Sequence, residues 1–408
     1  MNRGFFLNIG LTFIGILCSL AYKSLAASLF PKEELTRFLT LVDLISFVML
    51  LFLGFRSSLV VAYVNSGNDA PLLSLTRLVM VGVTLLVTPL LPMLANHLGI
   101  DLGFGWIIAL LWVTALWIYV TNQLAMYRLY GLVNAITLAE PLALLVALWV
   151  VSFWQALAPL ELLATASLLA FGMLSMLLLL LKGMRYPEPP WQFVWQGGER
   201  LFLRHALLAS LEFGFGMLSF YLAVYLYAQY GDLEEMGDFQ VVTKTLFMHL
   251  VMLFIFPVFR FLFPEVARMV AEGDKEAIEA LRQKMRLYAF GVGVSVWLLF
   301  YIGGELLIDR FFGSRYEGAL VMTLILFATL PFSIYNSFYI SLLRGYGRFG
   351  ATLHVRMAGV ACFLVAAGVG LAWSLWPYPI VIALAMAQVG MYLTSRFISR
   401  THLRNTKA

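Results

Sequence analysis

Twelve long apolar runs dominate the sequence, and each is about as long as a helix must be to cross a lipid bilayer. Because lipid cannot hydrogen-bond to open peptide groups, runs of this length are expected to be helical. Membrane strands would be shorter and half polar. The sequence therefore predicts an all-helical, integral membrane protein. The expected helices span residues 4–29, 38–64, 74–96, 105–126, 129–154, 159–182, 203–229, 238–263, 285–311, 318–343, 349–373 and 377–398.

The composition supports the same class. Hydrophobic residues make up 62% of the 408 residues and charged residues 12%, whereas a soluble domain carries roughly 25% charged residues. The first apolar run exceeds the roughly 7–15 residues of a signal-peptide core, so it is interpreted as the first membrane helix. Two cysteines, Cys18 and Cys362, lie inside apolar runs and are too few for a disulfide framework or a zinc site.

A polar interval rich in proline and glycine separates the sixth run from the seventh. Such residues end helices and mark linkers. The expected domains are therefore an N-lobe of six helices at 1–182, a cytoplasmic linker at 183–202, and a C-lobe of six helices at 203–408. Two lobes of equal helix number are a common plan among transporters.

The distribution of lysine and arginine predicts the orientation, because cytoplasmic loops of membrane proteins are enriched in these residues. Of the 27 basic residues, twenty are assigned to the even-numbered connections, their flanking helix ends and the tails if the N-terminus is cytoplasmic, and two, Lys244 and Arg356, are assigned to no connection. The odd-numbered connections hold only Lys23, Lys32, Arg37, Arg310 and Arg315. Both termini are thus predicted to be cytoplasmic. The net charge of +5 is explained by this distribution, and no nucleic-acid partner is expected.

One cytoplasmic connection has helical character of its own. The stretch 274–286 places Ile278, Leu281 and Met285 on one side, and Asp274 precedes it as a plausible N-cap. We expect a short amphipathic helix that lies on the membrane surface.

Ionisable residues inside membrane helices are costly and are therefore candidates for function. We select nine such candidates, of which six are cations and three are acids. The cations are Lys23, Arg56, Arg77, Lys244, Arg260 and Arg356. The acids are Asp43, Glu140 and Glu212. The excess of cations favours an anionic ligand.

Simpler interpretations of these charges stay open. Arg56 and Arg260 lie near the expected cytoplasmic boundary, where they could anchor the topology by reaching the interface. Glu140 and Glu212 suit proton coupling, but an inert ion pair with Lys244 or Arg77 would leave the same pattern. Stripes of small and hydroxyl residues, such as the one containing Gly15, are typical of helix packing.

The sequence holds no recognisable catalytic or nucleotide-binding motif. Its five histidines are scattered without the spacing of metal ligands. We therefore expect neither an enzyme nor a bound cofactor or metal. Transport by such a chain would depend on a gradient of H⁺ or Na⁺, on the membrane potential, or on the gradient of the substrate.

Three local patterns carry a resemblance to a known superfamily. They are Phe256–Arg268 at the end of the eighth run, Phe311–Tyr316 before the tenth, and Leu342–Arg348 at its end. With twelve helices in two sixes, the chain resembles the multidrug/oligosaccharidyl-lipid/polysaccharide (MOP) exporters. Within that superfamily it is most similar to the Wzx-type flippases of O-antigen repeat units.

This resemblance implies two lobes around a central cavity, with alternating access. The implied substrate is an undecaprenyl-pyrophosphate-linked oligosaccharide, flipped from the cytoplasmic to the periplasmic leaflet of a bacterial inner membrane. Related lipid II flippases carry cations on helices 1, 2 and 8 and an acid on helix 2. The matching positions are Lys23, Arg56, Lys244, Arg260 and Asp43. Membrane lipids and the polymerase and glycosyltransferase machinery are the implied partners.

The chain also departs from its relatives. Lipid II flippases have fourteen helices, and the acid often found late in helix 7 of polysaccharide flippases is absent, since Glu212 lies earlier. Two alternatives remain. A multidrug exporter of the same superfamily would need an acid-dominated cavity for cationic drugs. A membrane polymerase or ligase for lipid-linked sugars would need a large outer loop, and the longest outer loops here have roughly ten residues.

Overall fold

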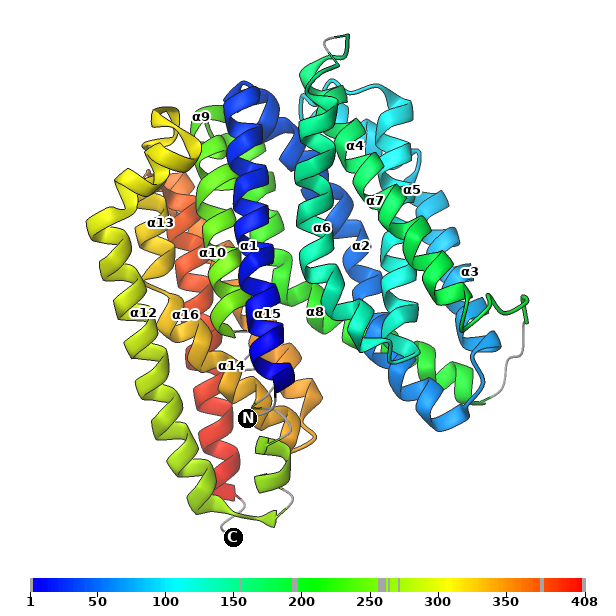
Figure 1. Ribbon diagram of the computed structural model, residues 1–408. Coiled ribbons are helices and arrows are strands. Elements are labelled where there is room, and N and C mark those ends of the chain that lie inside the picture. Colours follow the sequence, from blue (N-terminus) through cyan, green and yellow to red (C-terminus); the bar gives the residue numbers. More distant parts are fainter. Residues whose placement is uncertain are drawn as a thin grey trace. The chain divides into compact units, whose positions relative to one another are not determined.

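The described part of the chain is almost entirely helical. The computed structural model describes residues 3–154, 156–192, 197–255, 262, 265–270, 272–374 and 378–405. Among these residues, 12 helical segments are long and apolar enough to cross a membrane, which confirms the predicted number. Figure 1 shows them in chain order.

The chain divides into two compact units, Met1–Gly214 (unit 1) and Phe215–Ala408 (unit 2). Seven helices lie wholly in unit 1. They are α1 (Arg3–Leu29), α2 (Lys32–Ser66), α3 (Ala70–Val87), α4 (Leu90–His97), α5 (Phe104–Met126), α6 (Tyr130–Val151) and α7 (Pro159–Gly183). The next helix, α8 (Gly197–Tyr230), belongs to both units.

Unit 2 continues with the eighth span, which is built from α9 (Leu233–Gly237), η1 (Asp238–Thr243), α10 (Lys244–Leu250) and η2 (Val251–Ile255). The remaining described elements follow the eighth span in the chain. They are α12 (Lys275–Phe312), the short η3 (Ser314–Tyr316), α13 (Ala319–Phe327), α14 (Leu330–Gly345), α15 (Phe349–Trp373) and α16 (Pro379–Asn405).

Close helix packing in unit 1 depends on glycines. A Cβ atom at Gly54 of α2 would collide with the backbone and hydroxyl of Ser210 on α8, and one at Gly15 of α1 would collide with the carbonyl of Thr137 on α6. The hydroxyl of Ser210 also donates to the carbonyl of Leu51. The first half of α8 therefore packs on α2, and the boundary between the two compact units falls inside α8.

Unit 2 uses the same device. Gly359 of α15 packs against Met391 of α16, and Gly390 of α16 packs against Cys362 of α15. Gly293 of α12 similarly accommodates the ring of Pro331 on α14. In lipid, no hydrophobic force drives helices together. Small residues stabilise their association instead, because they let two helix backbones approach closely.

Several predicted helices are interrupted. The third span breaks at Thr88–Pro89 between α3 and α4, and the tenth breaks between α13 and α14, just before Pro331. Proline removes a backbone donor and clashes with the preceding turn, which accounts for both breaks. The eighth span contains two π-helical segments, η1 and η2, which periodicity did not predict.

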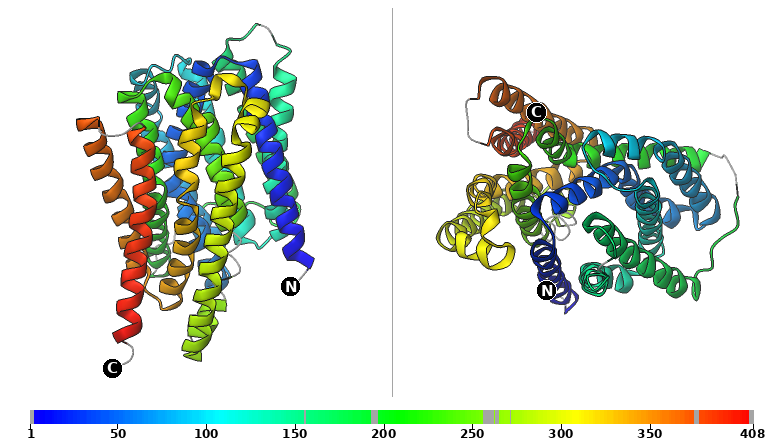
Figure 2. Two further views of the ribbon diagram at one scale, coloured as in Figure 1. Left: turned by 90° about the vertical axis from the view of Figure 1, so that its left-hand side faces the viewer. Right: turned by 90° about the horizontal axis from the view of Figure 1, so that it is seen from above.

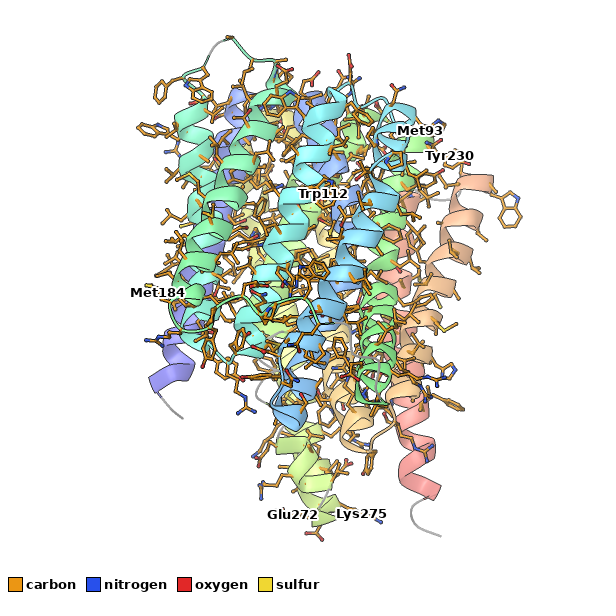
Figure 3. All side chains as sticks on the ribbon, turned by 90° about the vertical axis from the view of Figure 1, so that its right-hand side faces the viewer. Met93, Trp112, Met184, Tyr230, Glu272 and Lys275 are labelled. Atoms are coloured by element: carbon orange, nitrogen blue, oxygen red, sulfur yellow. The ribbon has the colours of Figure 1, made fainter. Side chains whose placement is uncertain are left out.

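The prediction of a separate surface helix at 274–286 was wrong. It forms the start of α12, which runs without a break for 38 residues (Figure 2). Asp274 caps it as predicted, since its carboxylate accepts a hydrogen bond of 2.9 Å from the backbone of Ala277. Lys275, the first residue of α12, and nearby Glu272 lie at the projecting N-terminal end of this helix (Figure 3). No proline or glycine separates the two halves, so the helix continues.

The glycine at position 54 provides a test of this packing. We expect Gly54→Val to lower the stability of the solubilised protein by about 1–3 kcal/mol, because the added carbons must displace the backbone of α8. Gly82→Val in α3 is the matched control, since nothing lies within 4 Å of its Cβ position. Thermal unfolding followed by tryptophan fluorescence measures the difference, and equal midpoints for the two variants would contradict the packing.

Candidate functional site

Four donor side chains from three helices converge on one carboxylate in unit 1. We call Arg77 (α3), Tyr119 and Gln123 (α5) and Lys182 (α7) the anion cradle. Its occupant is Glu188, which follows α7 in the chain. The ammonium of Lys182 lies 2.6 Å from Glu188 Oε2, and the hydroxyl of Tyr119 donates to Oε1 over 2.5 Å.

The remaining two donors complete the cradle. Gln123 Nε2 lies 2.9 Å and 3.1 Å from the two carboxylate oxygens, and its own Oε1 accepts from Lys182 over 3.1 Å. A guanidinium nitrogen of Arg77 lies 3.8 Å from Oε1 of Glu188. Both carboxylate oxygens are thus surrounded by donors.

Glu188 is presented by an extended segment, Tyr186–Gln192, which we call the strap. Figure 3 shows Met184, where α7 has ended and the chain turns toward the strap, and Met93 of α4 at the opposite end of unit 1. At its start, the strap stacks the ring of Tyr186 on that of Tyr127, with 4.3 Å between the centroids. The phenol of Tyr127 in turn donates to Asp69 over 2.6 Å.

The far end of the strap is held by α3. Arg77 donates to the carbonyl of Pro189 over 2.9 Å, and its guanidinium lies 4.7 Å from the ring centroid of Trp191. The backbone of Gln192 donates to the hydroxyl of Ser74 over 2.9 Å. Part of the linker that was expected between two lobes is therefore a fixed structure on unit 1.

The two members of the Lys182–Glu188 ion pair are buried to different degrees. The side chain of Lys182 is 1% exposed, whereas that of Glu188 is 38% exposed. Partial burial alone would raise the pKa of Glu188, but the hydrogen bonds from Lys182, Tyr119 and Gln123 outweigh it and hold the pKa below its usual value. The ion pair therefore persists until the pH falls below the ordinary range of a glutamate pKa.

Two of the predicted cations of unit 2 each lie against the part of α8 that belongs to that unit. The ammonium of Lys244, at the start of α10, lies 5.9 Å from the ring centroid of Tyr221. The guanidinium of Arg356, on α15, lies against Gly216, where a Cβ atom would be only 3.3 Å from its Nε. A terminal nitrogen of Arg356 is 3.8 Å from the sulfur of Met391. Lys244 on α10 therefore neighbours α8, and Arg356 on α15 neighbours both α8 and α16.

The other predicted site residues are placed as follows. Lys23 on α1, Asp43 on α2, Glu140 on α6 and Glu212 on α8 are half-buried, and Arg56 on α2 is exposed. Arg260 lies outside the described residues, as does much of the Phe256–Arg268 pattern. The functional assignment of all of these residues stays a prediction.

Sequence reasoning missed most of the cradle. It listed Arg77 among the cations for an anionic ligand, counted Lys182 only as one of the twenty basic residues of the even-numbered connections and tails, and did not use Tyr119, Gln123 or Glu188. One signal was available, because Asn122 and Gln123 form a polar pair near the end of an apolar run. Both are buried, and Asn122 donates to the carbonyl of Phe52 on α2 over 3.0 Å. The pairing with Glu188 required the path of the strap.

Comparisons with known proteins identify the fold. No protein-family model matches the sequence, and no curated protein matches it either. Solved structures do match. The lipid II flippase MurJ aligns with a TM-score of 0.72 and 13% identity, covering 97% of this chain and 87% of that one.

Two MATE transporters align over a similar length. A multidrug resistance MATE family transporter of the MOP superfamily gives a TM-score of 0.70 at 13% identity, over 98% of this chain and 95% of that one. VcmN, a MATE transporter of Vibrio cholerae, gives 0.64 at 15% identity, over 98% and 96%. At such low identity these similarities establish the fold, which is the predicted one.

The ion pair in the cradle predicts a stability effect. We expect Glu188→Ala to lower the free energy of unfolding by about 2 kcal/mol, because the ammonium of Lys182 is left buried without its carboxylate. Adding Lys182→Met removes the buried charge, so the double variant should recover part of the loss. Thermal unfolding midpoints of the wild type, both single variants and the double variant give the coupling. Strictly additive effects would contradict a direct interaction.

Proposed function

We propose that this protein is a flippase that moves an undecaprenyl-pyrophosphate-linked oligosaccharide from the cytoplasmic to the periplasmic leaflet. The step would serve the synthesis of a bacterial polysaccharide, such as an O-antigen, a capsule or an exopolysaccharide. Its support begins with the fold, which is shared with a structure named as a lipid II flippase. It also rests on the family resemblance of three local sequence patterns.

The observation that carries the proposal is that Lys244 and Arg356, both within membrane-spanning helices, each lie against α8, at Tyr221 and Gly216. Cations inside a membrane protein are costly unless they have a use or a partner. A pyrophosphate in a medium of low dielectric constant needs cationic donors, and arginine offers two parallel hydrogen bonds to it. Both cations therefore fit a lipid-linked pyrophosphate.

The remaining charged residues have proposed roles in the same cycle. Lys23, Arg56, Arg77 and Arg260 would provide further positive charge for the pyrophosphate and the sugars. Asp43, Glu140 and Glu212 are the candidates for coupling to H⁺ or Na⁺. Transport would proceed by alternating access, in which each leaflet is reached in turn. The chemistry needs no cofactor, because no covalent bond of the substrate changes.

The cellular setting is part of the proposal. The enrichment of lysine and arginine in alternate connections supports a bacterial inner membrane with both termini in the cytoplasm. The substrate would arrive from membrane glycosyltransferases and leave toward a polymerase. Membrane lipids are the other partners.

A second candidate function is export of drugs coupled to an ion gradient. Its specific support is that two of the similar structures are MATE transporters, one of which is described as a multidrug resistance transporter. The candidate site residues selected within the spans, six cations against three acids, favour an anionic cargo over a cationic drug.

The decisive experiment is a leaflet-resolved translocation assay. The full-length protein is reconstituted in proteoliposomes with a fluorescent lipid-linked oligosaccharide, with and without a gradient of H⁺ or Na⁺. We expect protein-dependent appearance of the lipid in the opposite leaflet. Absence of flipping under every gradient, together with efflux of a cationic dye, would replace the proposal with the multidrug alternative.

The assay also tests the two cations of unit 2. Lys244→Gln and Arg356→Gln should each lower the flipping rate at least about tenfold, because each removes a charged hydrogen-bond donor worth about 1.5–3 kcal/mol. Lys284→Gln is the control, since Lys284 is exposed near the start of α12. Unchanged rates for both variants, at equal protein levels, would mean that these cations serve packing and not cargo binding.

A further inference from the structure

We propose that the anion cradle is a binding site for a phosphate or pyrophosphate group, and that Glu188 occupies it as an internal substitute for that anion. The anion enters when the carboxylate of Glu188 swings out. The identity of the anion as a lipid headgroup rests on the proposed function. The binding of a phosphate group by the cradle does not.

The donor set is the first argument. Arg77, Tyr119, Gln123 and Lys182 present an ammonium, a guanidinium, a phenol and an amide to a single pair of oxygens. Two of the four donors carry a full positive charge, whereas Glu188 supplies one negative charge. A phosphate group offers the same kind of oxygen acceptor with more charge, so it would satisfy the cradle more fully than the carboxylate does.

The exposure of Glu188 is the second argument. A charge shielded from water depends on its counter-ion much more than an exposed charge does, because leaving it unpaired is costly. Here the lysine is 1% exposed and fixed, whereas the glutamate is 38% exposed. Lys182 is therefore a buried cation that needs an anion beside it. Glu188 is the member of the pair that water already reaches and that another anion could replace.

The attachment of the strap is the third argument. The strap is held by the stacking of Tyr186 on Tyr127, by the bond from Gln192 to Ser74, and by the bond from Arg77 to Pro189. None of these contacts uses the carboxylate of Glu188. Rotation of that side chain would vacate the cradle while the strap stays in place. Arg77 has a nitrogen for each task, since Nη2 binds Pro189 and Nη1 faces Glu188.

The position along the chain is consistent with loading of cargo. The cradle is built near the C-terminal ends of α5 and α7. The distribution of basic residues predicts that this end of unit 1 faces the cytoplasm. A lipid-linked pyrophosphate made on the cytoplasmic leaflet would meet the cradle at that level, where Glu188 keeps the cations satisfied until the cargo arrives.

The test is binding of inorganic pyrophosphate and of a prenyl pyrophosphate to the purified full-length protein, without divalent cations. We expect Glu188→Ala to bind both ligands with a dissociation constant at least tenfold lower than that of the wild type. Pyrophosphate should also raise the unfolding midpoint of Glu188→Ala, because it replaces the missing negative charge. Tighter binding of the prenyl compound identifies the lipid as the source, and equal binding identifies the phosphate group alone.

Two variants control the result. Glu188→Ala combined with Lys182→Met leaves the space but removes the buried cation, and it should lose the gain in affinity. Glu265→Ala removes another glutamate that pairs with an arginine, Arg268, at 2.6 Å, and it should bind like the wild type. If Glu188→Ala does not fold, Glu188→Gln serves in its place, with the rise in unfolding midpoint on adding pyrophosphate as the readout.

Three results would overturn the inference. In the first, pyrophosphate does not raise the unfolding midpoint of either Glu188 variant. In the second, folded Glu188→Ala binds pyrophosphate with the affinity of the wild type. In the third, the double variant binds pyrophosphate as tightly as Glu188→Ala does. Any of these would leave Glu188 as a purely structural counter-ion. Failure of the proposed function is a separate outcome, because pyrophosphate binding requires no transport. A protein that binds pyrophosphate through the cradle but flips no lipid would retain the site and lose the flippase assignment.

Discussion

Lipid offers no hydrogen bonds to a peptide group, and this constraint shapes the whole chain. Every span must satisfy its backbone within itself, so the apolar runs become helices. Where proline removes a donor, as at Pro89 and Pro331, the span is divided into two shorter helices. Because lipid is as apolar as leucine, helices associate through close contact, and glycines such as Gly54 and Gly359 allow that contact.

The same constraint applies to charges. An ammonium in this environment needs an anion or a ring face, and the described cations meet that need in different ways. Lys182 has the carboxylate of Glu188, and Lys244 lies near the ring of Tyr221. Arg77 is divided between a carbonyl, a carboxylate and an indole ring. A count of charges from sequence treats these cations as equivalent, although their neighbours differ.

The fold could be predicted from sequence because length and apolarity are properties of each run by itself. The twelve spans, the helical class and the cap at Asp274 all follow from local pattern. The candidate site could not be predicted to the same degree. Glu188 lies in a proline-rich segment with no periodicity, and its partners lie 65 and 69 residues away at Gln123 and Tyr119. The π-helices of the eighth span were missed for a similar reason, since their hydrogen-bond shift leaves no signature in an apolar run.

The unbroken length of α12 has a mechanical consequence. At about 1.5 Å per residue, its 38 residues extend for about 57 Å, whereas the hydrocarbon core of a bilayer is about 30 Å thick. A helix without a proline or a hinge behaves as a lever. A tilt of about 10° around one end would carry the other end through about 10 Å. A small reorientation among the packed helices of unit 2 would therefore move the end of α12 near Lys275 by a distance large enough to make or break contacts with a soluble protein.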